Sequence, residues 1–193
     1  MPVDDLDTSR LIVRKLRPED DVSYFSCTDE GLNEFIKEEA LAYQRERMGN
    51  TYLVFYEEKV VAYFTQSVDA IRVQKMPYDE RISEFEHMEY YPALKIGRLA
   101  VDKNYEKQGI GSFLLSLICD MGYELSERFG CRFILLNANP DSVSWYERYG
   151  FKKLRERRRR EPTMYLDILA ITNRLYPVEN ANLGKTAQNR RFG

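Results

Sequence analysis

The chain has 193 residues, which suits one domain with a sizeable core and is short for two. Hydrophobic residues make up 44% of it, which excludes a wholly disordered chain. The net charge is -2, from 29 basic and 31 acidic residues, so the chain lacks the overall basic excess of a protein that coats nucleic acid.

The N-terminal half predicts one helix and three strands. Residues 11–16 are typical of a strand. Residues 30–48 have apolar side chains at helical spacing, and Thr28 is the expected N-cap. Residues 51–56 and 60–67 are aromatic and β-branched, which favours two strands in a hairpin, although the turn between them has no Gly or Asn.

The second half starts with a polar stretch, residues 72–92, that contains Pro77 and Pro92 and predicts a variable excursion. A long amphipathic helix is then expected between Gly109 and Gly130, because its apolar positions follow a 3.6-residue period and glycine often ends a helix. The remaining predicted elements are strands at 94–101, 132–136, 151–154 and 164–169 and a short helix at 140–149.

These elements predict a single α/β domain over residues 1–175, followed by a polar tail, residues 176–193, that is expected to be disordered or to bind a partner. The longest uncharged apolar stretch, residues 109–119, is too short for a bilayer, which needs ~20 residues. The acidic N-terminus does not resemble a signal peptide. Three scattered cysteines and one histidine give neither a disulfide framework nor a metal site, so we expect a cytoplasmic protein without membrane or metal.

Residues 96–112 carry the clearest chemical signal. They read as a strand, a short loop and a helix start that contains Gly109 and Gly111. A helix start presents free N–H groups and a positive dipole end to phosphate, and glycines let a ligand approach the backbone closely. No Gly-Lys-Ser/Thr ends the loop and no third glycine follows, so it is neither a P-loop nor a dinucleotide fingerprint. A plain structural turn is the alternative reading.

A second block extends the signal, at residues 132–139 and 144–151, the latter ending in Tyr146-Glu147-Arg148-Tyr149-Gly150-Phe151. Together the two blocks resemble the GNAT superfamily of acetyl-CoA-dependent N-acetyltransferases over residues 9–170. The resemblance implies a central mixed, mostly antiparallel, twisted sheet with splayed strands and helices on both faces. It also implies an enzyme that transfers the acetyl group of acetyl-CoA directly to a primary amine in a ternary complex.

The resemblance also implies the cofactor contacts. The family's pyrophosphate loop falls on residues 106–111, where Glu106 stands in place of the usual Gln or Arg and leaves the backbone contacts intact. The pantetheine arm would pair with the strand backbone, Asn139 would contact the cofactor, and Tyr146 would protonate the departing CoA thiolate. The implied cofactor-binding residues are Leu99, Ala100, Val101, Lys107, Gln108, Gly109, Ile110, Gly111, Ser112 and Asn139.

No general base is evident. The position that often holds a Glu in the family, six residues before Val101, is Lys95. Glu84, Glu86 and Glu89 could reach back from the excursion, or water could relay the proton. An α-amine, with a pKa of about 7.7–8.0, needs less help than a lysine-like amine, which mildly supports an aminoacyl or N-terminal acceptor.

Residues 32–37, 60–65 and 97–102 resemble the GNAT branch that contains the aminoacyl-tRNA-acetylating toxins. This implies an aminoacyl-tRNA acceptor, with a protein, peptide or small amine as alternatives, and tRNA or a small protein as partner. A homodimer stays open. The basic run at residues 152–160 is read either as a solvated hairpin or as an RNA-binding surface. The alternative function is a catalytically silent acyl-CoA-binding or RNA-interaction module on the same fold.

Overall fold

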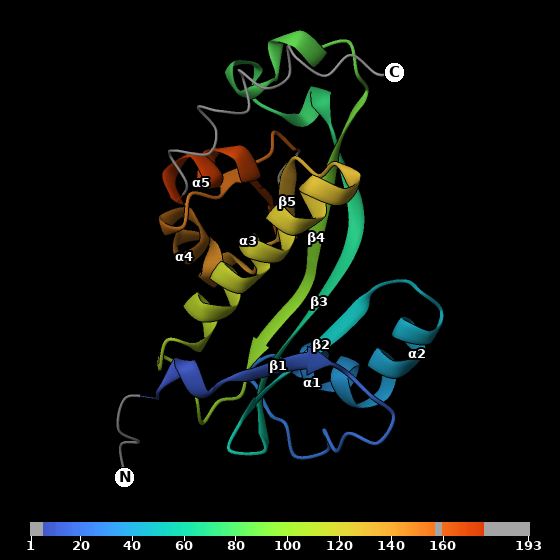
Figure 1. Cartoon of the computed structure of the whole chain (residues 1–193), viewed down its shortest axis with the longest axis vertical. Helices are drawn as coiled ribbons and strands as arrows, with labels where there is room; N and C mark the ends of the chain where they lie inside the picture. The colour runs from blue at the N-terminus through green and yellow to red at the C-terminus, as the bar shows by residue number, and fades with distance from the viewer. Residues whose placement is uncertain (1–5, 157–159, 176–193) are drawn as a thin grey trace, which may run out of the picture.

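The computed structural model describes residues 6–156 and 160–175, which form a seven-stranded sheet with helices on both faces (Figure 1). The strand order is β1-β2-β3-β4-β5-β7-β6, and every neighbouring pair is antiparallel except β4 and β5. The predicted mixed, mostly antiparallel sheet is therefore confirmed. The strands are β1 (Ile12–Lys15), β2 (Asn50–Tyr56), β3 (Lys59–Arg72), β4 (Tyr90–Val101), β5 (Phe133–Asn137), β6 (Lys152–Lys153) and β7 (Thr163–Asp167).

The parallel pair of strands separates partway along its length. β4 pairs with β5 only from Ala93 to Ile96, whereas on its other edge β4 pairs with β3 as far as Val101. The last residues of β4, from Gly97 on, therefore have no strand partner on the β5 side. This is the expected splay, and it leaves backbone N–H and C=O groups of β4 free to pair with something other than sheet.

Helices pack on the two faces of the sheet. α3 (Ile110–Phe129) runs between Gly109 and Gly130 as predicted, and its buried side chains pack on one face together with residues of α4 (Val143–Arg148) and α5 (Ile168–Leu175). α1 (Glu30–Glu34) and α2 (Ala40–Arg45) belong to a separate core on the opposite face. Figure 1 shows both units flanking the long β3–β4 pair.

The first helical unit differs from the continuous helix predicted at residues 30–48. Asp29, not Thr28, is the N-cap, and its carboxylate accepts a hydrogen bond from the N–H of Leu32 at 3.2 Å. A π-helical segment, Phe35–Glu39, separates α1 from α2. α2 ends at Arg45 because Arg47 takes a left-handed conformation with φ 59°. The sequence pattern predicted a helical segment here but neither the π-helical interruption nor the N-cap residue.

β3 and β4 extend further than predicted. β3 continues to Arg72 and β4 already begins at Tyr90, so the excursion is a shorter segment with three 3₁₀ turns (Val73–Lys75, Tyr78–Glu80 and Ser83–Phe85). Its apolar residues join a third core around Tyr91, Phe133 and Tyr165. The hydroxyl of Tyr91 contacts the backbone of Ile82 and Phe85 at 3.2–3.4 Å. The excursion is therefore packed against the end of the sheet.

The C-terminal elements also need a correction. The strand predicted at residues 164–169 ends at Asp167, and the chain continues as α5. The Asp167 carboxylate accepts a hydrogen bond from the N–H of Leu169 at 2.9 Å, which supports a helix start there. β6 is only two residues long, shorter than the predicted strand at 151–154. The expected disordered tail, residues 176–193, lies outside the described residues, as do Arg157, Arg158 and Arg159.

Asp102 fixes the loop that leads from β4 to α3. Its carboxylate is buried and accepts hydrogen bonds from the N–H groups of Ser26 at 3.0 Å and Asn104 at 2.9 Å. We expect Asp102→Ala to lower the free energy of unfolding by about 1–3 kcal/mol, because two partly buried N–H groups lose their acceptor. Urea denaturation measures this, with Asp102→Asn, which keeps an oxygen, as the milder control. Equal stability of the Ala variant and the wild type would show that the loop is held by other contacts.

Candidate active site

A cleft of about 950 Å³ opens where β4 and β5 separate. Its floor is the β4 segment 95–101, and its walls come from the start of α1, from the residues after β5 and from α4. Five of the residues predicted from the sequence line this one cleft, although they come from two separate parts of the chain. They are Leu99, Ala100, Val101, Asn139 and Tyr146.

Tyr146 sits on α4 with its ring buried between Trp145, at 4.8 Å between ring centres, and Phe151, at 5.5 Å. The backbone carbonyl of Tyr146 accepts hydrogen bonds from the N–H groups of Tyr149 and Phe151, which ties the end of α4 to the chain that follows. Burial raises the pKa of Tyr146 to about 12, because a phenolate would be poorly solvated there. At neutral pH the side chain is therefore a protonated donor that faces the cleft.

The shape of β4 at the cleft depends on Gly97. A side chain there would place its Cβ 2.7 Å from the Oγ1 of Thr65 on β3, which is too close for any other residue without movement. The pairing of β3 with β4 also shifts register between Thr65 and Gln66, as in a β-bulge. The glycine and the bulge both lie within the β4 stretch that lines the cleft.

The loop before α3 contains two left-handed residues, Lys107 with φ 63° and Gly109 with φ 84°. The first helical hydrogen bond runs from the N–H of Phe113 to the carbonyl of Gly109. The N–H groups of the three preceding residues, 110–112, therefore have no carbonyl one turn back and are available to an anion. The Ile110 side chain is buried, so this residue offers only its backbone.

The remaining loop residues have individual roles. The Gln108 amide donates to the carbonyl of Asn104 at 3.1 Å, and the hydroxyls of Ser112 and Tyr149 lie 2.6 Å apart. A Cβ added at Gly111 would lie 3.5 Å from the Trp145 ring, which is an ordinary contact. Residues 107–112 do not line the cleft itself, but Glu106, directly before them, does.

Two cationic residues, Lys95 and Arg98, belong to the part of β4 that forms the floor of the cleft. Lys95, at the position where the family often has a carboxylate, pairs with Asp69 of β3 at 3.2 Å. Arg98 stacks its guanidinium 3.5 Å from the centre of the Phe35 ring and 5.6 Å from that of Tyr43. Among residues 6–156 and 160–175 Arg98 has no carboxylate partner, and it lines the cleft.

The carboxylates of the cleft were not found from the sequence. Glu84, Glu86 and Glu89, considered above as bases that reach back, do not line it; Glu84 bonds to Ser83 and Glu89 lies 3.4 Å from Arg72. The acidic residues that do line it come from four different segments, so no local pattern pointed to them. They are Asp29, Asp69, Glu106 and Glu161.

Within the described ranges no group of His, Cys, Asp or Glu side chains is arranged to hold a metal ion. None of the helices in that part of the chain combines the length and the apolar character that a membrane span needs.

Residues 48–153 match the family model described as an acetyltransferase (GNAT) domain. A tRNA-acetylating toxin of Mycobacterium tuberculosis is 24% identical over 140 residues, which are 72% of this chain and 82% of that protein.

Two solved structures illustrate the likeness in fold. AtaT complexed with acetyl-methionyl-tRNAfMet superposes with a TM-score of 0.72 at 21% identity, covering 86% of this chain and 99% of that one. A tyrosine-to-phenylalanine mutant of KacT superposes with a TM-score of 0.75 at 21% identity and the same coverage. AtaT has also been solved with acetyl-CoA and with its antitoxin AtaR.

Proposed function

The chain belongs to the GNAT acetyltransferase family and is an acetyl-CoA-dependent N-acetyltransferase, and we propose that it acetylates the α-amine of an aminoacyl-tRNA by direct transfer in a ternary complex. One observation carries the catalytic part of this proposal. The protonated phenol of Tyr146 faces the same cleft as the unpaired edge of β4.

The residues around the cleft suit acetyl-CoA. We assign the pyrophosphate to the N–H groups at the start of α3, which directly follow the left-handed Gly109. The free edge of β4 at Leu99–Val101 would pair with the amides of the pantetheine arm, as a missing strand would. Asn139, whose side chain caps the turn at Asp141 and lines the cleft, is placed to contact the arm from the β5 side.

When bound, acetyl-CoA supplies a thioester whose carbonyl carbon accepts the amine. In the proposed step the acceptor nitrogen forms the C–N bond, the C–S bond breaks, and Tyr146 gives its proton to the leaving thiolate. The amine loses a proton at the same stage. Asp29, Asp69, Glu106 and Glu161 are the described carboxylates in the cleft that can take it, directly or through water.

An aminoacyl-tRNA acceptor is supported by two kinds of observation. The relatives include a tRNA-acetylating toxin and a toxin solved with acetyl-methionyl-tRNA. In the cleft, Lys95 is held by Asp69, and no glutamate stands at the usual position of the base. Such a site suits an acceptor that loses its proton easily, and an α-amine has a lower pKa than a lysine side chain.

The basic run at residues 152–160 contributes less to this proposal than the sequence suggested. Lys152 pairs with Glu80 and Lys153 pairs with Glu147, so two of its cations already have partners. The N–H of Arg155 bonds to the carbonyl of Lys75 and anchors the run to the excursion. An RNA contact by Arg157, Arg158 and Arg159 concerns residues outside those the structure describes.

Transfer of radiolabelled acetyl groups tests the proposed acceptor. We expect label on total charged tRNA and loss of that label when the tRNA is deacylated first, because the α-amine leaves with the amino acid. A panel of polyamines, aminoglycosides and peptides should be labelled far more slowly. Turnover of a small amine with no label on charged tRNA would overturn the tRNA proposal and leave the acetyltransferase assignment standing.

A further inference from the structure

A second groove adjoins the cleft, and its residues play no part in the chemistry described above. It has a volume of about 1080 Å³ and lies between α2 and the C-terminal half of α3, across the start of β2 and the middle of β3. Met48, Ser67 and Val68 line both cavities, so the groove and the cleft meet over β3. The junction gives a continuous path along the protein surface from the groove to the cleft.

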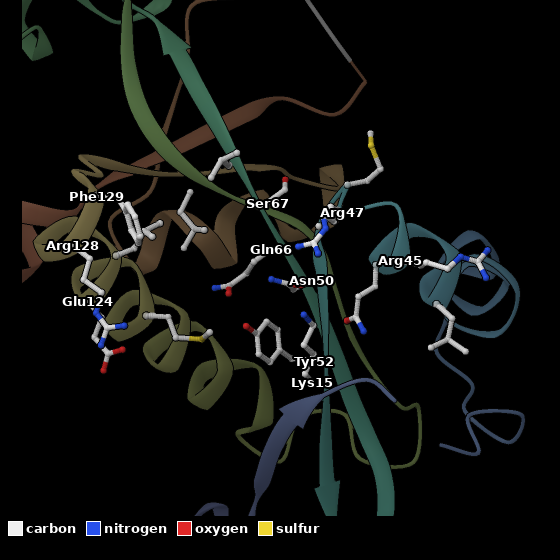
Figure 2. Close-up of a pocket in the computed structure, with 18 of the residues that line it drawn as sticks. Lys15, Arg45, Arg47, Asn50, Tyr52, Gln66, Ser67, Glu124, Arg128 and Phe129 are labelled. Atoms are coloured by element: carbon white, nitrogen blue, oxygen red, sulfur yellow. The ribbon is translucent and has the colours of Figure 1, made fainter. Parts of the chain in front are cut away.

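The groove is lined by an excess of positive charge. Its cations are Lys15, Arg45, Arg47 and Arg128, and its one carboxylate is Glu124, whereas the chain as a whole has a net charge of -2. Arg45 lies 3.7 Å from Glu46 at an exposed position, and the other three cations have no salt bridge within the described part of the chain. Figure 2 shows Arg45 and Arg47 on the α2 side and Arg128 on the α3 side.

The groove also contains a buried donor without a partner. Gln66 is only 8% exposed, and its Nε2 finds no hydrogen-bond acceptor among the described residues. Figure 2 shows the amide turned into the groove, beside Asn50 and Tyr52. A buried amide without an acceptor is unfavourable, so a ligand that brings an oxygen to this point would be stabilised there.

Exposed apolar side chains flank the charges. Val68 is 83% exposed, Phe129 82% and Met48 62%, and all three line the groove. Arg47 and Met48 are held at its mouth by the turn that ends α2, where the N–H of Met48 bonds to the carbonyl of Tyr43. Cations beside an exposed aromatic ring suit a single-stranded nucleic acid, since phosphates meet the cations and a base can stack on the ring of Phe129.

We infer that this groove binds the single-stranded 3′ end of the RNA acceptor and directs its terminal amine over Ser67 into the cleft. The inference rests on the proposed function and adds the path of the acceptor to it. The charge excess, the unpartnered Gln66 amide and the junction of the two cavities are independent observations. A single ligand explains all three: a polyanion that brings oxygen atoms to the groove and ends in an amine that reaches the cleft.

The test compares two triple variants with the same change in charge. The first is Arg45→Gln, Arg47→Gln and Arg128→Gln; the control is Lys37→Gln, Lys59→Gln and Lys103→Gln, which changes exposed lysines outside both cavities. In the groove variant we expect KM for charged tRNA to rise about tenfold or more, with kcat and acetyl-CoA affinity near wild type. The slope of log(kcat/KM) against log[salt] should become shallower by about 2, since each lost phosphate contact removes about 0.7.

A single variant addresses stacking without changing charge. Phe129→Ser alters an exposed side chain and leaves the core intact, and we expect it to raise KM for charged tRNA about fivefold or more.

These experiments distinguish an error in the proposed function from an error in the inference about the groove. If wild-type protein leaves charged tRNA unlabelled, the proposed function is wrong. If wild type labels it and the groove variant matches the control in KM and salt slope, only the inference about the groove is wrong. The same conclusion follows if the groove variant keeps its tRNA kinetics but loses affinity for a protein partner.

Discussion

Replacing Tyr146 by Phe should lower kcat by about 10²–10⁴-fold and leave acetyl-CoA affinity within a few-fold of wild type. The ring is held by Trp145 and Phe151, and these contacts do not involve the hydroxyl, so the variant should keep its fold. Only the hydroxyl, which we propose as the proton donor for the leaving thiolate, is removed. Steady-state kinetics with the labelled acceptor and calorimetry with acetyl-CoA measure the two quantities separately.

Tyr149→Phe is the matched control for Tyr146→Phe. It removes a hydroxyl from the end of the same short helix and breaks the contact with Ser112, yet kcat should change only a few-fold. The pH dependence of kcat in the wild-type protein adds a second check on Tyr146. Burial raises the pKa of Tyr146 to about 12, so the acid form is lost only as pH rises through that value, and kcat should not fall between pH 7 and about 10 for this reason. Unchanged kcat in Tyr146→Phe, with chemistry rate-limiting, would remove Tyr146 from the mechanism.

Replacing Gly109 by Val should weaken acetyl-CoA binding about 5- to 150-fold. Gly109 has φ 84°, a conformation in which a β-branched residue is strained by about 1–3 kcal/mol. We expect the loop to relieve that strain by turning the first N–H groups of α3 away from the pyrophosphate. Calorimetric titration with acetyl-CoA measures the loss, and a thermal melt establishes that the variant is folded.

Gly111→Ala is the companion to Gly109→Val. Gly111 lies inside α3 with ordinary helical geometry, and its added Cβ would make only a normal contact with Trp145. Its acetyl-CoA affinity should therefore stay near wild type. Equal affinities in both variants would mean that the backbone conformation at residue 109 does not orient the phosphate-binding groups.

Structural features that depend only on residues close together in the chain were predictable from the sequence. α3 was found with both its ends because the apolar period and the two flanking glycines act within one segment. The hairpin of β2 and β3 was found from its residue types, although Glu57 and Glu58 take the left-handed conformations that Gly or Asn usually supplies. The predicted cap at Thr28 was wrong by one residue, since Asp29 also favours a helix start.

Features that depend on distant parts of the chain were not predictable. β3 reaches Arg72 because β4 pairs with it along that whole length, and no local pattern signals the pairing. Residues 168–169 are apolar and favour a strand, but they pack as the first turn of α5. The same reason explains the site: Tyr146 and Asn139 lie in one sequence motif, whereas Asp69 enters the cleft only through the register of β3 against β4.

The length of β3 also bears on how the protein avoids aggregation. Beyond Gln66 its outer edge has no β2 partner, so a strand from another molecule could add to the sheet there. Asp69 stands in the middle of this stretch, where its carboxylate accepts the N–H of Ala70 at 2.7 Å and also pairs with Lys95. The side chain thus occupies a donor that an incoming strand would need and adds a charge to the edge. One aspartate protects the molecule against edge-to-edge association at the place where its longest strand is least covered.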